Sequence, residues 1–242
     1  MTNSDYPQVA AVIPAAGAST RFPGETGKQF QLLAGKPLLV HTLERVWRAD
    51  AVRMVAVAVP EENLVYAGDL LQPLVPEGVG LMVVVGGETR QASVAAGLEA
   101  LPQDIEVVTV HDAVRPLFEP RWIRDTVALC RDFDGAIVAV PAIDTLKEVE
   151  PVSATAAGSC GTISRTIPRA SVWQAQTPQT FRAGILRQAL RNAEETGLEG
   201  TDEASLVEAV GGRIAVVEGS PHNIKVTTPD DWRYLEWRLR NG

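Results

Sequence analysis

Short apolar, β-branched runs recur along the chain and constrain its fold more than any other feature of the sequence. We expect strands buried on both faces at Val9–Pro14, Met54–Val59, Leu81–Val85, Val107–Val110 and Ala136–Val140. The intervening segments have the apolar spacing of helices: 37–49, 62–74, 88–101 and 120–132, although Gly68 and Pro73 weaken 62–74 as a continuous helix. Alternation of this kind produces right-handed crossovers and a mainly parallel sheet with helices on both faces. The sequence therefore predicts an α/β fold.

The alternation stops between residues 142 and 173. IDTLKEVE (143–150) has the pattern of an exposed strand, and 163–173 is predicted to return as a second strand after a turn-rich stretch. We interpret 142–173 as an antiparallel β-arm that projects from the main sheet. A loop without regular structure is the alternative, although connections of that length are uncommon.

The remainder of the chain returns to helices and a strand. We predict helices over 181–197 and 202–212, a strand over 213–219, and a last helix that begins at Thr228-Pro229. Since no linker interrupts the chain, we expect a single domain over 1–242.

Composition narrows the classes of function. The 242 residues are 45% hydrophobic and 21% charged, as in soluble globular proteins. A net charge of −8 argues against nonspecific binding to nucleic acid or to a membrane surface, because both need a basic field. No apolar stretch approaches the roughly 20 residues of a membrane span, and MTNSDYPQ lacks the basic region of a signal peptide. We expect a cytoplasmic protein with no nucleic-acid or membrane partner.

The loop after the first strand, PAAGASTRFPGETGKQF, has the features of an anion site. Ala15, Ala16 and Gly17 expose backbone N–H groups, and Arg21 and Lys28 supply full positive charges. A polyphosphate is the predicted ligand. The alternative is a tight turn from strand to helix that carries two solvated cations.

Two common phosphate-binding motifs do not fit this loop. In a Walker motif, Lys28 would precede Ser or Thr rather than Gln29, and Phe22 stands where the first glycine belongs. Ser19 occupies the second glycine position of the dinucleotide motif. Kinase and dehydrogenase functions are therefore disfavoured.

Later loops add further candidates beyond the carboxyl ends of the predicted strands, where ligands bind in open α/β sheets. Gly86 and Gly87 allow close backbone approach and Ser93 follows them, while HDAVRP supplies Asp112 and Arg115. Alone, the paired glycines would equally suit a glycine-rich helix start, whereas the position of Asp112 and Arg115 favours a ligand site over a surface ion pair. Other cationic or hydroxyl residues stand next to turns: Arg169, Thr177, Thr201 and Lys225.

Nucleophilic and metal-dependent chemistry finds little support in the sequence. The three histidines, His41, His111 and His222, lack the spacing of metal ligands. Cys130 and Cys160 form no CxxC motif, and there is no GxSxG elbow. We expect the reaction to depend on cations and backbone amides.

The ordered motifs PAAGxSxR…GKQF, GGxxRxxSV, HDAVRP, DTxK, QTPQ, TDEAS and NIKVTTPDD resemble those of the 2-C-methyl-D-erythritol 4-phosphate cytidylyltransferases. The resemblance extends from Val12 to the last helix. It implies a Rossmann-like nucleotidyltransferase domain and a homodimer formed through the arm. It also implies a reaction of CTP with methylerythritol phosphate that yields CDP-methylerythritol and pyrophosphate, with Mg²⁺ bound mainly through the CTP phosphates.

The resemblance also implies a role for each candidate residue. Arg21 and Lys28 match transition-state stabilisers, and Arg169 and Lys225 match residues that hold the acceptor phosphate. The cytidine positions are Ala15, Ala16, Gly17, Gly87 and Ser93. The positions around the methylerythritol moiety are Asp112, Arg115, Thr145, Thr177 and Thr201. Because Thr145 and Arg169 fall on or near the predicted arm, we expect them to complete the partner subunit's site.

Other functions remain open at this point. The ribitol 5-phosphate cytidylyltransferases share the scaffold, but Ala15-Ala16, Ala113 and Glu203 favour methylerythritol phosphate. A sugar-1-phosphate nucleotidyltransferase would leave the arm and HDAVRP unexplained, and a non-catalytic nucleotide-binding module would not need all the cations. Ser19 and Gly27 depart from the family pattern, and Gly27 leaves the pre-organisation of Lys28 open.

Overall fold

A seven-stranded mixed sheet forms the centre of the protein in the computed structural model, which describes residues 8–17, 27–155 and 158–241. The strand order is β11 (Ile214–Glu218), β7 (Gly135–Pro141), β10 (Trp173–Arg182), β6 (Val107–Val110), β1 (Val9–Pro14), β4 (Val52–Val59) and β5 (Gly80–Val85). Strand β10 is antiparallel to β6 and β7, and the other neighbours are parallel. The predicted α/β class with a mainly parallel, mixed sheet is confirmed.

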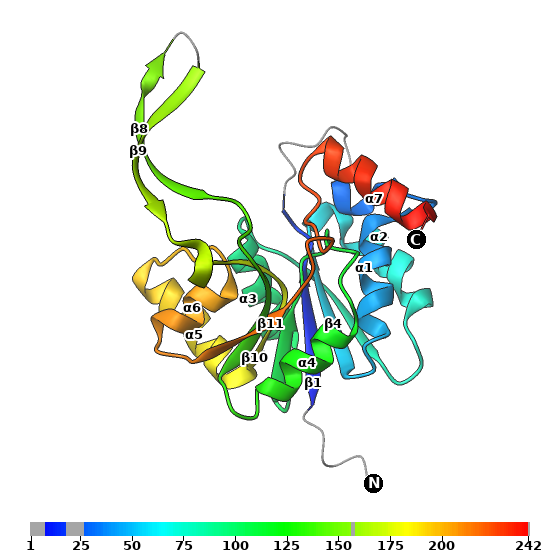
Figure 1. Ribbon diagram of the computed structural model, residues 1–242. Coiled ribbons are helices and arrows are strands. Elements are labelled where there is room, and N and C mark those ends of the chain that lie inside the picture. Colours follow the sequence, from blue (N-terminus) through cyan, green and yellow to red (C-terminus); the bar gives the residue numbers. More distant parts are fainter. Residues whose placement is uncertain (1–7, 18–26, 156–157, 242) are drawn as a thin grey trace.

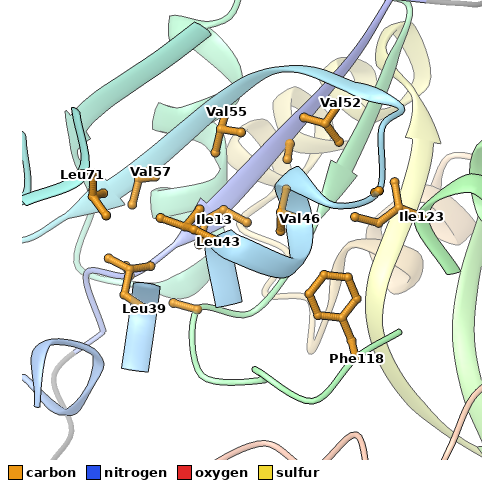
Figure 2. Packing of buried hydrophobic residues seen from close by; sticks show 14 of the residues in the cluster. Ile13, Leu39, Leu43, Val46, Val52, Val55, Val57, Leu71, Phe118 and Ile123 are labelled. Atoms are coloured by element: carbon orange, nitrogen blue, oxygen red, sulfur yellow. The ribbon is translucent and has the colours of Figure 1, made fainter. Parts of the chain in front are cut away.

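Helices cover both faces of this sheet (Figure 1). One face packs against α1 (Leu38–Trp47), α2 (Leu64–Leu71) and α4 (Arg121–Leu129). The other packs against α3 (Arg90–Ala100), α5 (Ala183–Thr196) and α6 (Glu203–Ala209). Figure 2 shows Ile13 of β1 beside Leu43 of α1 in the first of these cores. Burial of apolar side chains on both faces fixes the strands and so the loops at their ends.

A third, smaller core lies under the last helix, α7 (Pro229–Asn241). Leu235 of α7 packs with Leu33 and Val226. Leu33 belongs to a short antiparallel pair, β2 (Leu32–Leu33) and β3 (Lys36–Pro37). Asp231 accepts hydrogen bonds from the backbone N–H groups of Thr227 and Thr228 at 2.8 and 2.7 Å, and so ties the preceding loop to α7.

The predicted arm is a hairpin of β8 (Leu146–Thr155) and β9 (Gly158–Ile167), which pair antiparallel to each other. It projects from the end of the sheet on the side of α6 (Figure 1). The antiparallel arm is thus confirmed. A short 3₁₀ turn, η4 (Arg169–Ser171), joins it to β10.

Three details of the sequence prediction are wrong. Residues 173–182 form β10 in the main sheet, and α5 begins at Ala183 rather than at residue 181. The segment 62–74 is not one continuous helix: η2 (Glu61–Asn63) precedes α2, and η3 (Gln72–Leu74) follows it because Pro73 cannot continue α2. The second strand of the arm begins earlier than predicted, at Gly158.

Within the described parts of the chain, no helix has both the length and the apolar character that crossing a membrane requires.

Candidate active site

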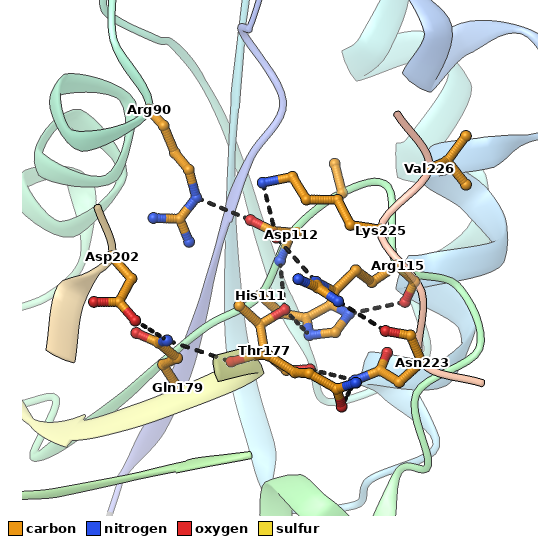
Figure 3. A network of polar contacts seen from close by, with 12 residues as sticks. Arg90, His111, Asp112, Arg115, Thr177, Gln179, Asp202, Asn223, Lys225 and Val226 are labelled. Carbon is orange, nitrogen blue, oxygen red and sulfur yellow. Dashed lines mark hydrogen bonds and ion pairs between the residues drawn. The ribbon is translucent and has the colours of Figure 1, made fainter. Parts of the chain in front are cut away.

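The candidate residues come from loops at one edge of the sheet, where the parallel strands end (Figure 3). The loops after β1, β5, β6 and β11 meet at this edge because those strands run in the same direction. Strand β10 runs the opposite way, so its first half also lies there. This topology brings residues from both ends of the chain to one place.

The loops after β1 and β5 approach so closely that side chains must be small. A Cβ atom on Gly86 would lie 2.4 Å from the Cβ of Ala16 and 2.9 Å from the hydroxyl of Ser93. Ser93 is buried, and its hydroxyl lies 3.2 Å from the carbonyl of Gly87 and 2.9 Å from that of Thr89. The predicted cytidine-binding positions on these loops are therefore neighbours in space.

Hydrogen bonds to neighbouring segments fix the end of the loop that follows β1. Lys28 begins the 3₁₀ turn η1 (Lys28–Phe30), and the Nε2 of buried Gln29 donates to the carbonyl of Ala15 at 2.6 Å. The Nζ of Lys28 donates to the carbonyl of Val226 at 2.7 Å, next to Lys225. Lys28 and Lys225, two predicted cationic site residues, thus lie on segments that touch in the folded protein, although they are far apart in the sequence.

Asp112 organises the cations of the site (Figure 3). Its Oδ1 accepts from Nε of Arg90 at 2.9 Å, and its Oδ2 lies 3.1 Å from Nε of Arg115 and 3.2 Å from Nζ of Lys225. Burial would raise the pKa of this carboxyl, but the nearby charges of Arg90, Lys225 and Arg115 lower the pKa well below its usual range. Asp112 is therefore ionised at neutral pH.

Arg90 and Glu203 are site residues that the sequence analysis did not select for this role. Nη1 of Arg90 lies 2.7 and 2.9 Å from the two carboxylate oxygens of Glu203, whose side chain is 1% exposed. Burial raises the pKa of Glu203 despite the opposing effect of Arg90. The only signals in the sequence were an arginine that follows the paired glycines and the glutamate of TDEAS.

A second, buried network of hydrogen bonds fixes the backbone around Asp112 (Figure 3). The hydroxyl of Thr177 accepts from the backbone N–H of Asp112 at 3.1 Å and lies 3.0 Å from Nδ1 of His111. Nε2 of His111 lies 3.0 Å from the carbonyl of Arg115, which can only accept, so Nε2 carries the proton and Nδ1 accepts from Thr177. Burial lowers the pKa of His111 to about 4, so the ring is neutral at pH 7.

The same network anchors the loop that carries Lys225. Asn223 is fully buried, and its side-chain amide donates to the backbone carbonyl of Thr177 at 2.9 Å, while the backbone carbonyl of Asn223 accepts from Nη1 of Arg115 at 2.7 Å. Gln179 donates to Asp202, the N-cap of α6, at 2.8 Å. Thr177 is buried, and its hydroxyl already takes part in two internal hydrogen bonds. Its predicted contact with the methylerythritol moiety of a substrate therefore remains a prediction.

The other predicted site residues are exposed or lie outside the described chain. Thr145 and Arg169 are exposed at the base of the arm, where Arg169 donates to the carbonyl of Ile143. Gly17 and Thr201 are also exposed. Arg21 lies outside the described residues.

Comparison with known proteins settles the family. The family model described as "IspD: 2-C-methyl-D-erythritol 4-phosphate cytidylyltransferase" matches residues 9–241. The protein of that name from Geotalea uraniireducens is 42% identical over 240 residues, which cover 97% of each chain. The chain belongs to the 2-C-methyl-D-erythritol 4-phosphate cytidylyltransferase family.

Further members of this cytidylyltransferase family agree in sequence and in fold. The Acidobacterium capsulatum protein is 43% identical over 242 residues, covering 96% of this chain and 98% of its own. The crystal structure of the Thermus thermophilus cytidylyltransferase is 32% identical, covers 96% of this chain and 99% of its own, and has a TM-score of 0.74. The synthase from Anaerococcus prevotii, at 25% identity, covers 97% of this chain and 99% of its own with a TM-score of 0.80.

A metal ion in this cytidylyltransferase site would need ligands that the described residues do not provide on their own. Among them, no group of three His, Cys, Asp or Glu side chains is placed to hold a metal ion. The Asp112 carboxylate, which faces the site, is already paired with three cations. This donor set fits a divalent cation that arrives bound to substrate phosphates.

Proposed function

We propose that this protein joins CTP and 2-C-methyl-D-erythritol 4-phosphate to give CDP-methylerythritol and pyrophosphate. The observation that carries the proposal is the gathering of Arg90, Arg115 and Lys225 around Asp112, with Lys28 bonded to the carbonyl next to Lys225, beside loops restricted to small residues. The group of cations suits two negatively charged reactants. The small residues of the loops suit close backbone contact with a nucleotide.

The reaction needs little from the protein beyond alignment and charge. The acceptor phosphate has a second pKa of about 6 and is mostly dianionic at pH 7, so one of its oxygens can attack the α-phosphorus of CTP without a general base. A new P–O bond forms as the bond from the α-phosphorus to the bridging oxygen breaks and pyrophosphate leaves. His111 is buried and neutral, in keeping with chemistry that moves no proton through a histidine.

Two pairs of cationic side chains have different roles in the proposed reaction. Lys28, with Arg21, stabilises charge on the phosphoryl oxygens and on the departing pyrophosphate. Lys225, with Arg169, holds the acceptor phosphate and offsets its repulsion from CTP. A divalent cation such as Mg²⁺, carried on the CTP phosphates, would neutralise part of their charge.

The protein acts as a homodimer in this proposal, with the arm of one subunit reaching the site of the other. Val149 and Ile163 pair across the hairpin and are 50% and 59% exposed, so the arm offers apolar surface to a second copy. Arg169 and Thr145 at its base are exposed, and in this proposal they reach the acceptor bound to the partner subunit. We place the enzyme in the cytoplasm, where CTP is available.

The test of this proposal is pyrophosphate release from CTP and Mg²⁺ with either methylerythritol 4-phosphate or ribitol 5-phosphate. Rapid release with methylerythritol phosphate alone is the expected result. Release with ribitol phosphate alone would keep the mechanism and change the acceptor. No release with either, from a folded protein that binds CTP, would favour a non-catalytic nucleotide-binding module.

A further inference from the structure

Arg90 connects three segments of the active site through one guanidinium group. It is the first residue of α3, Asp112 follows β6, and Glu203 is the first residue of α6. We infer that Glu203 and Arg90 form a positioning pair for the acceptor, in which Glu203 orients Arg90, Arg90 orients the Asp112 carboxylate, and that carboxylate sets the place of Lys225. This inference rests on the proposed function.

The burial of the two carboxylates gives the pair its rigidity. The side chains of Glu203 and Asp112 are 1% and 6% exposed, whereas that of Arg90 is 28% exposed. Among the described residues, Glu203 forms its ion pair with Arg90 alone. A buried carboxylate cannot exchange its partner for water, so Glu203 holds the guanidinium in a single orientation.

The contact with Arg90 determines which carboxylate oxygen of Asp112 is left to pair with the other cations. With Oδ1 taken by Arg90, only Oδ2 serves Arg115 and Lys225. The side chain of Lys225 is 39% exposed, so its ammonium pairs with Asp112 and still faces solvent, where an acceptor phosphate would bind. Without Arg90, both oxygens would be open to Lys225, and the ammonium would be drawn onto the carboxylate and away from the phosphate.

The nucleotide side of the site does not depend on the Arg90 side chain. The loop before α3 is held by the Thr89 hydroxyl, which accepts from the N–H of Ala92 at 3.0 Å. The Ser93 hydroxyl and the close contact of Gly86 with Ala16 hold the same loop. Loss of the Arg90 guanidinium should therefore weaken acceptor binding and leave CTP binding nearly unchanged.

The test compares R90Q, E203Q and the double variant R90Q/E203Q with wild type, by steady-state kinetics and thermal unfolding. R121Q is the matched control, because Arg121 is also the first residue of a helix and also pairs with carboxylates, but is 56% exposed outside the site. We expect R90Q to raise the KM for methylerythritol phosphate about tenfold or more and the KM for CTP less than about threefold. E203Q should give a smaller acceptor effect, because glutamine still accepts one hydrogen bond from Arg90.

The double variant separates positioning from stability. It removes the buried carboxylate that R90Q leaves unpaired, so it should unfold at a higher temperature than R90Q while keeping the raised acceptor KM. Recovery of the acceptor KM together with stability would overturn the inference, and so would equal increases in both KM values.

A binding measurement distinguishes failure of this inference from failure of the proposed function. Calorimetric titration of methylerythritol phosphate into protein loaded with α,β-methylene CTP should show the same loss of affinity in R90Q without any turnover. Active wild type with an unaltered R90Q would overturn the inference alone. Wild type that neither turns over nor binds this acceptor would overturn both.

Discussion

Lys28 combines a chemical task with a structural one, since its ammonium also donates to the carbonyl of Val226. We expect K28A to lower kcat by about 10²–10³, as loss of one preorganised donor to a transition-state oxyanion does, while the protein remains folded. Stopped assays of pyrophosphate release measure kcat, and circular dichroism checks that the variant is folded. K36A is the control, because Lys36 pairs only with Glu44 on the surface among the described residues. A K28A enzyme with more than a third of wild-type turnover would exclude Lys28 from the chemistry.

His111 makes the free energy of unfolding depend on pH. Burial lowers its pKa from 6.5 to about 4, against opposing effects of the Arg115 carbonyl and Asp112. Between these values the unfolded chain binds a proton that the folded protein does not, so stability falls as pH falls from about 6.5 to 4. Linkage gives a loss of about 3 kcal/mol over that range.

This pH effect is measurable as a difference from H111Q, which cannot titrate at that position. Urea unfolding at intervals from pH 7 to pH 4 should show the stability advantage of wild type shrinking by about 3 kcal/mol. A constant difference between the two proteins across this range would contradict the assignment of His111 as neutral and buried.

At the scale of elements, the strands of the parallel sheet were predictable and β10 was not. Runs such as 54–59 in β4 are continuously apolar because helices cover both faces of the strand. Strand β10 instead buries polar residues: Thr180 pairs with the hydroxyls of Thr109 and Thr126 at 3.0 and 2.8 Å. Its stability depends on partners distant in the sequence, which local patterns do not reveal.

The site follows the same division between local and distant signals. Loops after predicted strands gave Asp112 and Arg115, because the chain topology fixes where such loops lie. Nothing local indicated that Arg90 would meet Glu203, since residue type and spacing carry no information on contacts across 113 positions. The sequence indicated Lys225 only as a cation next to a turn, and the resemblance to the family supplied its role, but the contact of Lys225 with Asp112 is visible only in the structure.

The contact between the β1 and β5 loops predicts the effect of G86A. The new Cβ would lie 2.4 Å from that of Ala16, so the loops must separate, and we expect the KM for CTP to rise about tenfold or more. The double variant A16G/G86A removes one clash but leaves the one with Ser93, so it should recover part of the loss. G184A is the control, because a Cβ there would meet nothing within 4 Å. Identical CTP affinity in G86A and wild type would show that the nucleotide does not use this contact.

At the scale of the whole molecule, the proposed dimer makes each site a joint product of two chains. Neither K28A nor R169A homodimers should turn over at an appreciable rate. In an equimolar mixture, half of the dimers are mixed, and one of the two sites in each has both native residues. Exchange of subunits should therefore restore about a quarter of wild-type activity. Sedimentation analysis verifies that both variants are dimers, and a mixture as inactive as its components would contradict sharing through the arm.

The hydrogen bond from Lys28 to Val226 spans 198 positions of the chain, and it has a consequence for protein synthesis. A ribosome makes Lys28 long before Lys225, and chains generally fold from the N-terminus as they emerge. The strands β1, β4, β5 and β6 can assemble early, since they neighbour one another in the sheet. The acceptor side is completed only after the segment that carries Lys225 has been made. A nascent or prematurely terminated chain thus gains a place for the nucleotide before it gains any capacity to use it.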